Sequence, residues 1–194
     1  MTPVQRKNTE MAGLLSDQFQ QRYEPNFAVA NALSTMQLLP ELRGLWAFSS
    51  VNESGNALDL SGQGRTLTNN GATPRNVYGL VPYANMNGIA QYFSRADEAG
   101  LDITGALTLG GWFLTGQFGT NVMAMSKAGA VAGGLAYHIQ RLAANTYHFQ
   151  ISVDGTAVST VNSITTFTSI DWTFVVGRFI PSTELKIYKI GRAV

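Results

Sequence analysis

The chain has 194 residues, enough for one domain with a full hydrophobic core or for one domain with an appendage. Only 13% of the residues are charged and the formal net charge is +1, whereas Asn, Gln, Ser and Thr together supply 54 residues. This balance argues against nucleic-acid binding, which needs surplus cations to neutralise phosphates. Cysteine is absent, which excludes disulfides and thiolate metal sites. Neither a secretory signal nor a membrane helix is recognisable, so we expect folding in a cytoplasm.

The first 40 residues carry apolar side chains at steps of three and four, the period of an amphipathic helix. They predict one helix that ends at Pro25 and a second, shorter helix that ends at Pro40, so that residues 1–41 form a helical N-terminal arm. Helices this short need a surface to pack on, either their own domain or another molecule. We expect another molecule, bound through the apolar stripe formed by Leu15, Phe19, Tyr23, Phe27, Leu33 and Met36.

From Leu42 onward the hydrophobic period changes to two, which is typical of half-buried strands. Asp154-Gly155 predicts a two-residue type I′ turn between two of these strands. The many short strands predict a mainly β fold, an antiparallel two-sheet sandwich over residues 42–194. The strands are expected at 44–48, 89–94, 107–113, 121–126, 135–140, 147–153, 156–161, 172–179 and 185–190.

The three tryptophans, Trp46, Trp112 and Trp172, lie in strand-like segments and are expected to pack in the core. Residues 59–64 are predicted to form a tight turn that the Asp59 carboxylate caps.

Eight segments taken in chain order resemble one known pattern. They are Leu45–Phe48, Asp59–Gly64, Leu67–Gly71, Ala90–Phe93, Leu107–Phe113, Ser126–Gly129, Asp171–Gly177 and Leu185–Gly191. Together they resemble the laminin-G-like, concanavalin A-like jelly rolls. The departures are Ser-Arg after Phe93 and Ile190 in place of the usual Asn before Gly191. The resemblance implies a jelly roll that lacks its last strands at Val194, because the sequence ends early or because another segment or subunit closes the sandwich.

No spacing in the sequence indicates catalysis. The paired carboxylates of glucanases, the elbow of a nucleophilic triad and a phosphate-binding loop are all missing. Asp97 and Asp102 are expected in a solvated loop. We therefore expect no catalytic residue, no bound metal and no cofactor.

One polar patch stands out. If residues 142–146 form a turn, one face of a hairpin carries His138, Gln140, His148 and Gln150. Imidazoles and amides there suit a glycan. The alternatives are that these residues are exposed without a function, or that the two imidazoles hold a metal.

Three classes of function remain for such a sandwich. The resemblance implies a lectin or adhesin module, a glycoside hydrolase-related domain, or a head, collar or tail appendage of a bacteriophage virion. We expect the virion protein, a tail fibre or head decoration assembled in the host cytoplasm. Its arm would bind capsid, collar or tail proteins or form a homo-oligomer such as a trimer. Its sandwich would touch host glycans weakly or serve as pure decoration, with no nucleic acid or membrane as partner.

Overall fold

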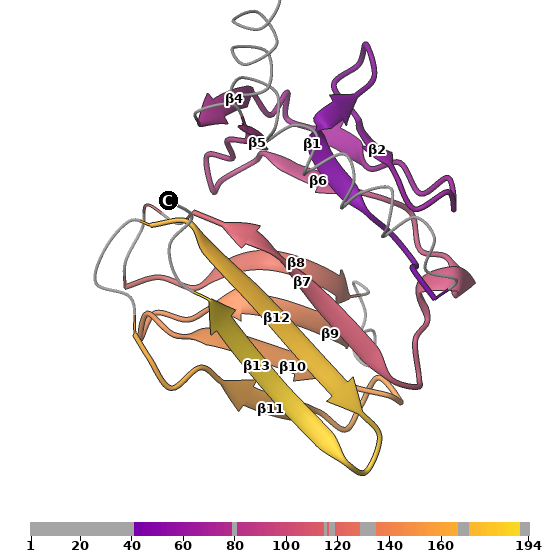
Figure 1. Cartoon of the computed structure of the whole chain (residues 1–194), viewed down its shortest axis with the longest axis vertical. Coiled ribbons are helices and arrows are strands. Elements are labelled where there is room, and N and C mark those ends of the chain that lie inside the picture. The colour runs from indigo at the N-terminus through magenta and orange to yellow at the C-terminus, as the bar shows by residue number, and fades with distance from the viewer. Residues whose placement is uncertain are drawn as a thin grey trace, which may run out of the picture. The chain divides into compact units, whose positions relative to one another are not determined.

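The computed structural model describes residues 41–78, 81–114, 116, 119–128, 135–166 and 171–190. The predicted helical arm, with all six residues of its stripe, lies outside these ranges. In the described part of the chain every paired strand is antiparallel, which confirms the mainly β fold class. Its one helix is the short 3₁₀ turn η1 (Ala99–Leu101), and no described helix has the length and apolar character needed to cross a bilayer. The chain divides into two compact units between Arg95 and Ala96 (Figure 1).

The first unit consists of three two-stranded ribbons. They pair β1 (Trp46–Val51) with β2 (Ala57–Asp59), β3 (Thr68–Asn70) with β6 (Tyr92–Ser94), and β4 (Arg75–Tyr78) with β5 (Val81–Ala84). The rings of Phe48 and Phe93 lie 5.0 Å apart between centroids and join β1 to β6. Ala57 is the one fully buried apolar residue in the described part of this unit, so polar contacts carry much of its order.

The Asp59 carboxylate holds the turn that follows β2. Its Oδ1 accepts hydrogen bonds from the N–H groups of Leu45 and Ser61, and its Oδ2 accepts them from the Arg65 N–H and the Ser61 hydroxyl, at 2.8–3.1 Å. Partial burial works against the charged form, but these four bonds outweigh it and keep the pKa of Asp59 below its ordinary value. The predicted capping role of Asp59 is confirmed.

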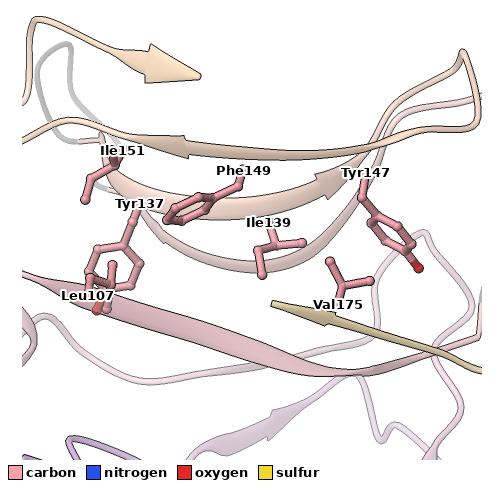
Figure 2. Packing of buried hydrophobic residues seen from close by; sticks show 7 residues of the cluster. All are labelled: Leu107, Tyr137, Ile139, Tyr147, Phe149, Ile151 and Val175. Atoms are coloured by element: carbon pink, nitrogen blue, oxygen red, sulfur yellow. The ribbon is translucent and has the colours of Figure 1, made fainter. Parts of the chain in front are cut away.

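The second unit is a sandwich of two sheets (Figure 1). One sheet has the order β11 (Ser159–Asn162), β10 (Tyr147–Ile151), β9 (Leu135–Arg141), β8 (Val122–Ala128). The other has the order β13 (Glu184–Ile190), β12 (Thr173–Ile180), β7 (Leu107–Phe113). Buried side chains from both sheets meet between them, as Figure 2 shows for Leu107, Tyr137, Ile139, Tyr147, Phe149, Ile151 and Val175.

Gly177 of β12 brings the backbone of its sheet close to a side chain of the opposite sheet. A Cβ built on this glycine would lie 2.5 Å from the ring of Phe149, which comes from β10 and is fully buried. Atoms cannot pack at that distance, so only glycine lets the Phe149 ring lie flat against the backbone of β12. This contact limits how far apart β10 and β12 can lie.

Two predictions about the second unit are wrong. Trp112 does not pack in the core and is 49% exposed. Along β7 it lies on the outer face with Thr108 and Gly110, whereas Phe113 lies on the face that packs against the core. Asp154-Gly155 does not form a two-residue turn, because only Gly155 has a positive φ and a type I′ turn needs two. The loop runs from residue 152 to residue 158, and the Asp154 carboxylate organises it by accepting from the Thr156 and Ala157 N–H groups.

We predict that Gly177→Ala lowers the free energy of unfolding of the sandwich by about 1–3 kcal/mol, because the added methyl group overlaps a ring that has no free space to move into. Urea unfolding of the full chain measures the change. Gly105→Ala is the matched control, since a Cβ there meets no atom within 4 Å and a change of at most about 0.5 kcal/mol is expected. Equal stability of the two variants would contradict the close contact.

Candidate functional site

The four residues predicted to share a hairpin face do share it. Residues 142–146 connect β9 to β10, where Leu142 and Asn145 bond across the turn and Asn145 has a φ of 58°. In the resulting register His138 lies opposite Gln150, and Gln140 lies opposite His148. These residues alternate with Tyr137, Ile139 and Phe149 of the core, so they occupy the outer face of the four-stranded sheet.

The neighbouring strands extend this surface with three polar residues that the sequence analysis did not single out, and Met123 of β8, which lies opposite Gln140 and is 49% exposed, borders them. On β11, Asn162 lies opposite His148 and Thr160 opposite Gln150, and on β8, Ser126 lies opposite His138. We call the whole surface the histidine face. It consists of Ser126, His138, Gln140, His148, Gln150, Thr160 and Asn162.

Sequence reasoning could not place Asn162, because it assumed the wrong turn. A two-residue turn at 154–155 would have set Val161 opposite His148, one position away from the register that the structure has. A shift of one residue moves every side chain of a strand to the other face. The seven-residue loop instead places Val161 opposite Phe149, where it packs on the core, and Asn162 beside His148.

The two imidazoles form the centre of the histidine face. Their ring centroids are 5.4 Å apart, and Nδ1 of His148 lies 2.8 Å from Oδ1 of Asn162. An amide oxygen only accepts, so Nδ1 of His148 donates to Asn162, which leaves Nε2 of His148 for a hydrogen bond with a ligand.

His138 differs from His148 in its exposure. It is only 7% exposed, and within the described part of the chain its Nε2 has no hydrogen-bond partner. Burial, and after it the charge of His148, lower the pKa of His138, so this ring is neutral at physiological pH. A neutral imidazole with an unused nitrogen can donate or accept, depending on its tautomer.

The chemistry of the histidine face is that of an uncharged hydrogen-bonding surface. It offers the imidazole of His148 together with amides and hydroxyls, whereas Nε2 of His138 is buried beneath the surface, and none of the seven residues is a carboxylate. Among the described residues, no group of three or more His, Asp or Glu is placed to hold a metal ion. Such a surface suits a neutral ligand that is rich in hydroxyl groups.

The acidic residues of the second unit have other partners. Asp97 and Asp102 both pair with Lys127 on β8, the former at 2.8 Å, and both are exposed. The hydrogen bond and charge of Lys127 lower the pKa of Asp97. These carboxylates tie the segment around η1 to the sheet, which agrees with the solvated loop expected there.

The first unit contains a separate cavity of about 320 Å³. Phe48 and Phe93 line it together with Asn52, Asn69 and Thr73. Much of its polar lining is already engaged, because the Asn69 side chain bonds both the N–H and the C=O of Thr73, and Oδ1 of Asn52 accepts from Ser54 and Asn56. The histidine face is therefore the stronger candidate for binding.

Comparisons with protein-family models, with curated proteins and with solved structures found no match for this chain. What the sandwich binds must therefore be inferred from its own side chains. Their arrangement favours recognition through hydrogen bonds.

We predict that the stability of the sandwich falls as the pH drops below about 6.5, the ordinary pKa of histidine, and that His138→Gln removes much of this loss. The pKa of His138 is lower in the folded state than in the unfolded state, so the unfolded chain takes up the proton first. Stability is thus complete above pH 6.5 and declines toward the folded pKa, by at most about 1.4 kcal/mol per pH unit. Urea unfolding across this range measures it, and an unchanged slope in the variant would contradict the assignment.

Proposed function

We propose that this chain is a structural protein of a bacteriophage virion, a head, collar or tail appendage whose sandwich binds host-surface glycans weakly. The observation that carries the proposal is the histidine face, an uncharged array of imidazole, amide and hydroxyl groups on four adjacent strands. Sugar hydroxyls both donate and accept, as these groups do. Strands hold such groups in fixed positions, which lowers the entropy lost on binding.

The placement of the carboxylates supports a binding role over catalysis. Glycoside hydrolysis needs two carboxyl groups that face the same bond. In the described residues, Asp59 bonds backbone N–H groups, Asp102 pairs with Lys127, and Glu184 pairs with Lys186. Acidic side chains thus serve the architecture, and the surface richest in ligand-binding groups carries none.

The composition and the sequence pattern support the proposed assembly into a virion in the host cytoplasm. A chain without cysteine and with abundant Ser, Thr, Asn and Gln suits assembly in a host cytoplasm. The second unit supports a laminin-G-like jelly roll through its two antiparallel sheets. Residues 1–41 would anchor it to capsid, collar or tail proteins or hold copies together as a homo-oligomer, where avidity strengthens weak glycan contacts.

We predict that the full chain binds neutral glycans on an array, and that the double variant His148→Ala, Gln150→Ala loses about thirtyfold in affinity, because each of the two lost hydrogen bonds contributes roughly 1 kcal/mol. Ile164→Ala is the matched control, since Ile164 is fully exposed and lies outside the histidine face. Circular dichroism checks that all chains fold. An array without binding, or equal binding by the double variant, would contradict the glycan proposal.

We predict that the chain is present in purified phage particles and that Leu15→Asp with Phe19→Asp prevents its incorporation, because charges interrupt the apolar stripe. Mass spectrometry of particles assembled with each chain measures occupancy. Asp17→Asn is the control, as it changes a polar position of the same segment. Incorporation of the double variant at the wild-type level would rule out anchoring through the arm.

A further inference from the structure

The outer face of the three-stranded sheet carries exposed aromatic rings. Trp112 lies opposite Phe174, and the adjacent row sets Gly110, Val176 and Tyr188 side by side across the three strands. Trp112 is 49% exposed and Tyr188 is 42% exposed. We call this surface, formed by Gly110, Trp112, Phe174, Val176 and Tyr188, the aromatic face.

The rings of the aromatic face are held by their neighbours. The ring centroids of Trp112 and Phe174 are 5.2 Å apart and the rings are tilted by 43°, an arrangement typical of a stabilising aromatic pair. Phe174 is half-buried and supports Trp112 from the side. An indole that is fixed in this way loses little entropy when a ligand stacks on it.

Gly110 adds no side chain to the surface beside Trp112 on β7. A Cβ at this position would lie 2.9 Å from Cγ2 of Val176 and 2.8 Å from the Val175 carbonyl oxygen. Trp112 and Tyr188 come from strands on either side of β12 and from adjacent rows, so their backbones are roughly 12 Å apart at the usual strand spacing and rise, with Phe174 and Val176 between them. Two exposed rings at this separation match a chain of several sugar rings better than a single one.

A cationic cluster adjoins the aromatic face on the same sheet. The next row places Arg178 opposite both Thr108 and Lys186, and Glu184 follows at the end of β13. Glu184 accepts from Lys186 at 2.8 Å and pairs with Nε of Arg178 at 3.4 Å. Two cations thus share one carboxylate, which leaves an excess of one positive charge.

The two cations of this cluster are more exposed to solvent than the carboxylate that they share. The side chains of Arg178 and Lys186 are 47% and 55% exposed, whereas that of Glu184 is 14% exposed. The hydrogen bond from Lys186 to Glu184, and then the charge of Glu184, raise the pKa of Lys186, so it stays protonated at physiological pH. An anion that approaches this row from solvent can therefore contact Arg178 and Lys186 without contacting the Glu184 carboxylate.

We propose that the aromatic face and the adjoining Arg178 and Lys186 bind an acidic polysaccharide, with sugar rings stacked on Trp112 and Tyr188 and a uronate carboxylate paired with the cations. Apolar ring faces and regularly spaced negative charges occur together in this class of ligand. Single-stranded nucleic acid fits less well, because a charge on every nucleotide demands more cations than one row supplies. A protein partner fits less well, because a cationic row lies directly beside the rings and interface cores are depleted of charge.

This site is independent of the histidine face, because the two surfaces lie on different sheets of the sandwich and face away from the shared core. Binding of acidic chains with intact affinity in the histidine-face variant would therefore separate the two proposals. Failure of one leaves the other in place.

The test is a calorimetric titration of the full chain with an oligogalacturonate and with its methyl ester, which has the same rings without the charges. We expect Trp112→Ala and Tyr188→Ala each to weaken acid binding at least about fivefold, since stacking on an aromatic ring contributes roughly 1 kcal/mol or more. Arg178→Gln should weaken binding of the acid and leave binding of the ester unchanged. Glu184→Gln should tighten binding of the acid, because it removes the competing carboxylate.

Two controls exclude misfolding and binding through the histidine face as explanations of the result. The half-exposed positions of Trp112 and Tyr188 allow both variants to fold, and thermal unfolding checks this. His148→Ala should leave acid binding unchanged. Equal affinity for the acid and the ester, tighter binding of a single-stranded oligonucleotide than of the acid, or wild-type affinity in both aromatic variants would each overturn the proposal.

Discussion

The contact between Phe149 and Gly177 is the constraint on which the second unit depends. The ring is fully buried and a side chain at position 177 would overlap it, so β10 and β12 approach each other at one defined spacing. Close-packed interiors transmit such a constraint to the strands on both sides. Once Tyr147, Phe149 and Ile151 face the core, the period of the strand turns His148 and Gln150 outward.

The same alternation gives the sandwich two outer surfaces with different chemistry. The histidine face is uncharged and offers hydrogen bonds from imidazoles, amides and hydroxyls. The aromatic face offers rings beside a cationic row. Because the buried core lies between them, the two proposed binding surfaces share no residue.

Polar residues also replace hydrophobic burial in the first unit. Asp59 collects four hydrogen bonds, and the indole N–H of Trp46 donates to the Arg65 carbonyl at 2.7 Å. Charge-assisted bonds to backbone groups are stronger than neutral ones, which compensates for a small apolar core.

The sequence by itself determined the mainly β class, most strand positions, the capping role of Asp59 and the shared face of His138, Gln140, His148 and Gln150. These features follow from local rules, namely alternation along a strand and the turn at 142–146. Only the tertiary structure decided that Trp112 faces outward and that Asn162 joins His148, because the phase of β7 and the register of β11 depend on which side chains reach the core. A strand with apolar residues in both phases, such as Leu109 with Trp112 and Phe113, has no preferred face until a second sheet covers one of them.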